Sequence, residues 1–278
     1  MRAPARVEPR TLAPPERRLA RVSGVERLGA YHFISAEDEQ GPPDPRPGQF
    51  YMLAAHERWG GGADERPYLP RAFSHARARL ESDGLALSFL LEAIGPGTER
   101  LSRLEPGEEL ALVGPLGIGF RPPEDGTRAL LVGGGIGVAP LLCLNEELPD
   151  AGVLLGFRSA AHAQAAALFP GSPDVVTDDG SVGRRALVSE PLVAALDADP
   201  AATVFACGPP PMLEAVRALC VERGVPAQLA LESGMACGYG ACFGCVVPTA
   251  EGYVRLCVDG PVLNAHMLET AIFPGAGH

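Results

Sequence analysis

The stretch Ala129-Leu-Leu-Val-Gly-Gly-Gly-Ile-Gly-Val-Ala-Pro140 passes from an apolar segment into a glycine-rich one without a charged residue. Residues 129–132 have the length and composition of a buried strand. Pro140 suits the first turn of a helix, which we expect to run to about Glu147. A glycine-rich turn between strand and helix lets backbone N–H groups approach a diphosphate. The candidate nucleotide-binding residues are therefore Gly133, Gly134, Gly135, Ile136 and Gly137.

The sequence after this turn repeats the same alternation. Strand-like apolar runs at 152–157, 174–177 and 203–206 alternate with helical patterns at 160–168, 188–196 and 211–223. Such alternation predicts a parallel sheet with helices on its faces. The turn alone is a moderate signal, because Pro140 stands where the last glycine of G-x-G-x-x-G would be and many tight turns use glycines only for packing.

The N-terminal part has a different pattern. Short apolar runs between residues 22 and 120 are separated by Gly and Pro turns, which predicts an antiparallel β-barrel or sandwich. The segment His56–Pro70 is rich in Gly, Pro and charge and is interpreted as a surface excursion. The Arg-rich residues 1–21 are expected to form a flexible tail. The predicted domains are therefore a tail at 1–21, a barrel at 22–122, an α/β domain at 123–226 and a small module at 227–278.

Composition excludes some classes of partner. The chain has 278 residues, a net charge of −11 and a pI near 5.0, which disfavours nucleic acid and anionic membrane surfaces. No apolar run follows the N-terminal arginines, as a secretory signal would need, so a cytoplasmic location is expected. No nucleophile–base pair calls for hydrolytic chemistry.

The cysteines give the most specific signal. Cys237, Cys242 and Cys245 have the spacing C-x4-C-x2-C, and Cys257 follows, in the pattern of plant-type [2Fe–2S] proteins. Gly238, Gly240 and Gly244 are expected to let the loop fold tightly with positive φ, and Cys257 is expected to arrive from a strand at 253–256. A structural zinc site is the alternative, but such sites usually pair two C-x2-C knuckles.

Three weaker stretches lie between these signals. Cys207-Gly208-Pro209 follows a strand, at the sheet edge where ligands bind in open α/β folds. Arg71-Ala72-Phe73-Ser74 is expected on a strand, and Gly95-Pro96-Gly97-Thr98 is interpreted as a turn with a helix N-cap. Each also has a purely structural interpretation when it is taken alone.

Taken together and in this order, the five segments resemble the ferredoxin–NADP reductase superfamily. The resemblance implies a flavin-binding β-barrel followed by a nicotinamide-binding α/β domain. It implies that Arg71 contacts the flavin diphosphate, that Ser74 lies near the flavin ring, and that Gly97 and Thr98 form a second diphosphate contact. It also assigns residues 133–137 and Cys207-Gly208-Pro209 to NAD(P). Ala72 departs from the proline usual at that position.

The C-terminal module, from Glu232 to Val262, resembles the electron-transfer subunits of NAD-dependent dihydroorotate dehydrogenases of the B type. This resemblance implies FAD, a [2Fe–2S] cluster and NAD(H). It also implies a hetero-oligomer with a separate FMN-containing catalytic subunit that oxidises dihydroorotate in pyrimidine biosynthesis. Reductase subunits of sulfide dehydrogenase, NADH-dependent ferredoxin:NADP oxidoreductase or hydrogenase are the alternatives. The residues themselves do not favour NADH over NADPH, because Arg158 follows the second strand and could hold the 2′-phosphate of NADPH. Only the resemblance favours NADH.

Overall fold

The computed structural model describes residues 16–56, 69–82 and 84–276. The first fifteen residues of the predicted tail, and most of the predicted excursion at 56–70, lie outside these ranges. The prediction of a flexible tail is wrong for Arg17–Arg21, because these residues belong to the first strand. Exposed and buried side chains alternate from Arg17 to Val22, as they do in a strand with one face on a core.

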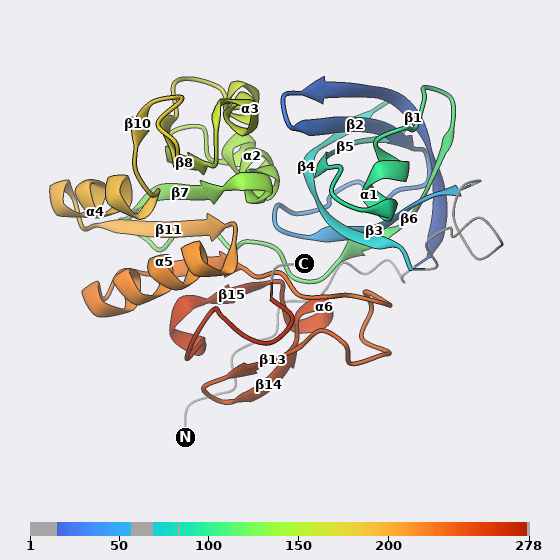
Figure 1. Ribbon diagram of the computed structural model, residues 1–278. Helices are drawn as coiled ribbons and strands as arrows, with labels where there is room; N and C mark the ends of the chain where they lie inside the picture. The colour runs from blue at the N-terminus through green and yellow to red at the C-terminus, as the bar shows by residue number, and fades with distance from the viewer. Residues whose placement is uncertain (1–15, 57–68, 83, 277–278) are drawn as a thin grey trace.

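The N-terminal domain is a closed six-stranded antiparallel barrel, as predicted (Figure 1). Its strand order is β1-β2-β5-β4-β3-β6. The strands are β1 (Arg17–Leu28), β2 (Tyr31–Asp38), β3 (Phe50–Ala55), β4 (Arg71–Glu81), β5 (Gly84–Glu92) and β6 (Glu109–Leu116), and the short helix α1 (Pro96–Leu101) lies between β5 and β6.

A buried ion pair lies inside this barrel. Arg18 points inward from β1 and donates from both Nε and Nη2 to Asp38 at the end of β2, at 3.0 and 2.8 Å. Its Nη2 also donates to the carbonyl of Gly114 on β6 at 2.7 Å. One buried guanidinium thus connects three strands, and its hydrogen bonds offset the cost of burying the charge.

The second domain is a seven-stranded sheet of order β10-β9-β8-β7-β11-β12-β15, parallel except for β15. Its strands are β7 (Arg128–Gly134), β8 (Gly152–Phe157), β9 (Asp174–Thr177), β10 (Arg184–Arg185), β11 (Ala202–Cys207), β12 (Ala227–Ala230) and β15 (Val262–Asn264). Its helices are α2 (Val138–Glu147), α3 (Ala160–Ala163), α4 (Ser189–Ala198) and α5 (Pro210–Arg223). The predicted parallel sheet with helices is confirmed.

Helix α2 connects the two domains. Its residues Val138, Leu141 and Leu142 belong to the same apolar cluster as Tyr31 and Leu90 of the barrel. Glu146 near its C-terminus binds Arg77 and Arg79 of β4 at 3.0 and 2.9 Å. Figure 1 shows α2 between the sheet and the barrel, with α5 on the opposite face of the sheet. The glycine-rich turn that begins this helix is therefore held next to the barrel.

The C-terminal residues do not form a separate body. Strands β12 and β15 complete the sheet of the α/β domain, so the sheet continues past the predicted boundary at residue 226. Between them lie the cysteine loop, the hairpin β13 (Val246–Thr249) and β14 (Gly252–Arg255), and the short helix α6 (Leu256–Asp259). Turns of 3-10 helix also occur at 135–137, 164–168 and 265–267.

The last residues are anchored to α5. The carboxylate of Glu214 accepts hydrogen bonds from Arg217, from the Thr270 hydroxyl and from the Ala271 N–H, at 2.6, 3.1 and 2.6 Å. These bonds, led by that from Arg217, lower the pKa of Glu214 to about 2. No helix within the described residues is long and apolar enough to cross a membrane.

Two local predictions need correction. The helix expected at 160–168 is α for only four residues and then tightens to 3-10 geometry. Cys257 does not come from a strand: β14 ends at Arg255, and the thiol is in the first turn of α6. The N–H of Leu256 still donates to the carbonyl of Cys245, one position beyond the last pair of the hairpin, and the chain then enters α6.

Candidate functional site

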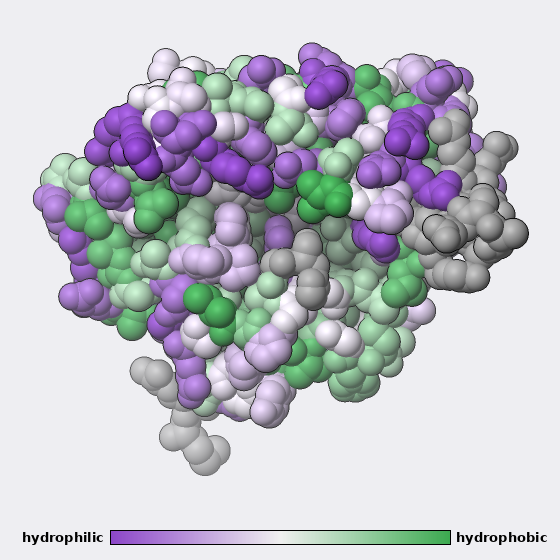
Figure 2. Space-filling model, viewed as in Figure 1, coloured by the Kyte–Doolittle hydropathy of each residue, from purple (hydrophilic) through white to green (hydrophobic). Residues whose placement is uncertain are grey.

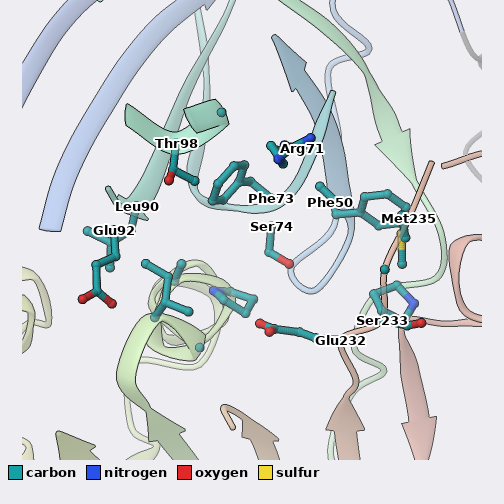
Figure 3. Close-up of a pocket in the computed structure, with 18 of the residues that line it drawn as sticks. Phe50, Arg71, Phe73, Ser74, Leu90, Glu92, Thr98, Glu232, Ser233 and Met235 are labelled. Carbon is teal, nitrogen blue, oxygen red and sulfur yellow. The ribbon is translucent and has the colours of Figure 1, made fainter. Parts of the chain in front are cut away.

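A cavity of about 530 Å³ lies where the barrel, the α/β domain and the C-terminal residues meet. Figure 3 shows Arg71, Phe73 and Ser74 along one strand of its wall and Glu232 across from Ser74. Nine of the residues predicted to bind cofactors line this cavity: Arg71, Ala72, Phe73, Ser74, Gly97, Thr98, Ile136, Gly137 and Cys207. Gly133, Gly134, Gly135, Gly208 and Pro209 do not line it.

The Arg71 strand and the Gly97 turn meet in the cavity wall. A Cβ at position 97 would lie 2.8 Å from Nε of Arg71, so glycine allows the guanidinium to lie over the start of α1. Nη1 of Arg71 donates to the carbonyl of Leu69 at 2.7 Å. A guanidinium held at this wall has the geometry and charge to bind a phosphate group.

The predicted turn with a helix N-cap at Gly95-Pro96-Gly97-Thr98 is confirmed. The N-cap of α1 is Gly95, and Thr98 is its third helical residue. The hydroxyl oxygen of Thr98 accepts from the N–H groups of Ile94 and Gly95 at 3.0 and 3.1 Å, as in a capping box. Its position in the wall is as expected, and its own hydrogen bonds shape the turn.

The two sequence motifs of the α/β domain pack directly on each other. Cys207 pairs in register with Gly133 at the carboxyl ends of β11 and β7. A Cβ at Gly137 would lie 2.5 Å from the carbonyl of Cys207, and one at Gly134 would lie 2.4 Å from Sδ of Met212. These two glycines therefore serve close packing. Gly135, with φ of +54° and only the Tyr31 hydroxyl, at 3.8 Å, near the position of an added Cβ, makes the turn itself.

Glu232 is a site residue for which the sequence carried no signal of its own. It follows β12 by two residues, and only the folded sheet brings it to the cavity beside Cys207. Burial raises the pKa of Glu232 to about 6. Burial, and then the charge of Glu232, raise the pKa of the Cys207 thiol well above its ordinary value, so this thiol is protonated at neutral pH. The pairing of a carboxyl with a thiol at this wall emerges only from the tertiary structure.

The four cysteines of the C-terminal loop form two interacting pairs. The thiols of Cys245 and Cys257 are buried and lie 3.2 Å apart. Partial burial acts to raise the pKa of Cys237, but hydrogen bonds, first from the backbone N–H of Cys242, lower it to about 6. Burial and the Cys245 thiol raise the pKa of Cys257 to about 12. Among the described residues, no three His, Cys, Asp or Glu side chains are grouped as they would be around a single metal ion.

This arrangement fits a two-iron cluster. Four cysteines hold a [2Fe–2S] cluster through its two irons, so two pairs of thiols meet the requirement. The loop has positive φ at Gly238 and Gly240, as predicted, which turns backbone N–H groups toward the sulfur atoms. The third predicted position is wrong: Phe243, with φ of 58°, takes the left-handed conformation instead of Gly244.

The cysteine loop is continuous with the cavity. Met235 lines the cavity and Cys237 follows two residues later. Phe50 lines the cavity too, and it belongs to one buried apolar cluster with Cys245 and Cys257. A Cβ at Gly238 would lie 2.5 Å from Cγ of Met52, so the loop packs tightly on the barrel.

Known proteins with similar sequences match nearly the whole chain. The family described as "Iron-sulfur cluster binding domain of dihydroorotate dehydrogenase B" matches residues 232–269. The dihydroorotate dehydrogenase B (NAD(+)) electron transfer subunit of Caldanaerobacter subterraneus is 35% identical over 255 residues, which are 88% of this chain and 96% of that protein. The corresponding subunit of Bacillus caldolyticus is 40% identical over 233 residues, 79% of this chain and 85% of its own length.

A solved structure shares the fold. A chain of the NADH-dependent reduced ferredoxin-NADP oxidoreductase superposes with a TM-score of 0.75 over 90% of each chain, at 23% identity. The relatives at 35 and 40% identity cover 88% and 79% of this chain and most of their own length. The chain therefore belongs to the family of electron transfer subunits of dihydroorotate dehydrogenase B (NAD(+)).

Proposed function

We propose that this chain carries electrons between NAD(H) and a [2Fe–2S] cluster by way of FAD, on behalf of an FMN-containing catalytic subunit that oxidises dihydroorotate in pyrimidine biosynthesis. The observation that carries the proposal is the continuity between the cavity and the cysteine loop through Met235 and Phe50. Bound FAD would exchange hydride with NAD(H) and single electrons with the cluster. The chain's own residues bind and orient these groups and exclude water from between them.

Each set of residues has one binding role in this proposal. Arg71, Gly97 and Thr98 hold the flavin diphosphate, and Phe73 and Ser74 border the flavin ring. The turn at 133–137 and the Cys207-Gly208-Pro209 loop hold NAD(H), and the buried wall at Cys207 shields its reactive end from water. Cys237, Cys242, Cys245 and Cys257 hold the cluster. The names of the relatives, which specify NAD(+), support NADH over NADPH.

The catalytic subunit is proposed to dock over the cysteine loop. Phe243 and Tyr253 are 63% and 79% exposed, and Tyr239 is exposed too. Figure 2 shows mainly hydrophobic residues at the lower right of the surface, over α6 and the loops near it. Exposed aromatic side chains are typical of protein interfaces. Since all described cysteines are free thiols, a reducing compartment such as the cytoplasm suits the assembled complex.

The first test measures iron, sulfide and flavin in the full chain purified without air. The wild type should contain two irons per chain in the [2Fe–2S] form, and NADH should bleach its flavin absorbance faster than NADPH. The Cys242→Ser variant should lose the cluster and keep most of its flavin, whereas Cys220→Ala in α5 should keep both. Unchanged iron in Cys242→Ser would reject the ligand assignment, and faster bleaching by NADPH would reject the nucleotide assignment.

The second test identifies the partner. A tagged chain recovered from its native cell should bring down a stoichiometric FMN-containing dihydroorotate dehydrogenase. Recovery of a different oxidoreductase in its place would show that the chain serves another electron-transfer complex.

A further inference from the structure

The side chain of Arg255 contacts the cysteine loop at two residues, which a fully solvated arginine would not do. It is the last residue of β14, two positions before Cys257. Its Nη1 donates to the carbonyl of Gly240 at 3.0 Å, and its guanidinium lies 5.1 Å from the centre of the Phe243 ring. The side chain is 33% exposed. The guanidinium thus contacts two of the three residues at which the loop backbone has positive φ, Gly240 and Phe243 but not Gly238.

The hydrogen bond to Gly240 acts on a particular peptide group. The carbonyl of Gly240 and the N–H of Ala241 belong to the same planar unit and point in opposite directions. The carbonyl accepts from Arg255, which fixes the orientation of this peptide group in the stretch between Cys237 and Cys242. A charged donor on the carbonyl also polarises the peptide group, so the Ala241 N–H becomes a stronger donor. Arg255 therefore orients one rigid group of the loop between two of the proposed ligands.

The contact with Phe243 holds the other end of the loop. Phe243 is the one non-glycine residue with positive φ in the part of the chain that the structure describes. Such a conformation is strained for an L-residue. Because the exposed ring is stacked beneath the guanidinium, a cation–π contact offsets part of this strain. Phe243 follows Cys242 directly, so the contact also fixes the exposed ligand.

Asp259 fixes the position of the guanidinium without neutralising it fully. Its carboxylate accepts from the Arg255 backbone N–H at 2.9 Å, while the side-chain Nε lies 4.0 Å away. Asp259 is also 42% exposed, so solvent screens its charge. The positive charge therefore remains available to the cysteine loop.

We propose that Arg255 is a positioning residue that raises the reduction potential of the cluster. This inference rests on the cluster ligation proposed above. Four thiolates give the site a net negative charge that grows on reduction. A cation held against the loop favours the reduced form, since net charge is one of the factors that set the potential of such clusters.

The test is an EPR-monitored redox titration of the full chain with its cofactors bound. In the Arg255→Gln variant, which keeps a donor but loses the charge, the ratio of reduced to oxidised cluster at a fixed potential should fall about tenfold, equivalent to about 59 mV for one electron. Arg255→Lys should restore most of the difference. Arg223→Gln on α5 is the matched control: its side chain is 32% exposed and paired with Asp197, and the potential should not change.

Iron analysis of the same samples makes every outcome decisive. If wild-type chain carries no cluster, the proposed function fails and not this inference. If Arg255→Gln loses its iron while Arg255→Lys keeps it, the charge is needed at the site and the proposal stands. Loss of iron in both variants would reduce Arg255 to a structural role. An unchanged potential in iron-replete Arg255→Gln, or an equal shift in Arg223→Gln, would overturn the proposal.

Discussion

At the scale of single residues, the cavity wall contains both a residue that the motifs predicted and one that they did not. Arg71 lies where its motif places it, at the wall beside Gly97. Glu232 begins the C-terminal segment that carries the family resemblance, but that resemblance did not place it in the cavity, because its position depends on β12 joining the sheet beside Cys207. A carboxyl whose pKa is about 6 titrates near neutrality, so its effects can be measured at mild pH.

Replacing Glu232 by Gln should make the protein more stable above pH 6. The folded pKa of about 6 exceeds the ordinary 4.5, so the unfolded chain releases this proton first and the wild type loses stability as pH rises from 4.5 to 6. The variant avoids this loss of ~1–2 kcal/mol. Thermal unfolding measured from pH 4 to 8 gives the stability of each protein as a function of pH. The two plots should diverge between pH 4.5 and 6 and run parallel above pH 6. Glu222→Gln on the exposed face of α5 should follow the wild type; curves for Glu232→Gln that never diverge would contradict the assignment.

Replacing Arg71 by Ala should weaken flavin binding. Loss of a charge-assisted hydrogen bond costs ~1.5–3 kcal/mol, so the dissociation constant of FAD should rise by about 10- to 100-fold. Flavin fluorescence after gel filtration measures the released cofactor. Arg103→Ala is the control, because that side chain is 72% exposed just after α1. A full flavin complement in Arg71→Ala would show that Arg71 does not contribute to flavin binding.

At the scale of elements, the regular α/β part is the part that sequence predicts best. The strands β8 and β9 have the predicted bounds, because continuous apolar runs between turns mark buried strands. The two-residue strand β10 and the start of β1 were not predicted, since neither forms an apolar run. The path through Cys257 was also mispredicted: its short helix is set by contacts with the cysteine loop, which are not local in sequence.

Placing a methyl group on Gly137 should separate the two motifs of the α/β domain. The added Cβ would lie 2.5 Å from backbone atoms of Cys207 and Gly208, which cannot yield as a flexible side chain can. We expect Gly137→Ala to lose ~1–3 kcal/mol of stability and to bind NADH more weakly. Denaturant unfolding and an NADH titration measure the two effects. Gly24→Ala is the control, because no atom lies within 4 Å of its added Cβ. Equal stability of the two variants would show that the motifs do not pack as described.

At the scale of the whole molecule, the chain order places a shared cavity between three parts of the chain. The barrel contributes β4, the α/β domain contributes the turn before α2, and the segment after β12 contributes residues 231–235 before it enters the cysteine loop. Because β15 returns to the sheet after the loop, the loop is fixed at both of its ends. Electron carriers bound in the cavity and at the cysteines would therefore keep a constant separation while the exposed side of the loop faces a partner.

The exposed side of the loop should be needed for the partner and not for NADH. Tyr253 stands two residues before Arg255 on β14, so the two side chains share one face of the hairpin, and Tyr253 is 79% exposed. Tyrosines at interfaces often contribute 1–2 kcal/mol or more, so Tyr253→Ser should raise the dissociation constant for the catalytic subunit by about tenfold or more. Anaerobic bleaching by NADH should keep its wild-type rate, since Tyr253 does not line the cavity. Leu187→Ser, which removes an apolar side chain that is 64% exposed next to β10, should leave both quantities unchanged. Equal weakening by both variants would point to a general loss of surface hydrophobicity, and no weakening by Tyr253→Ser would place the partner on another face.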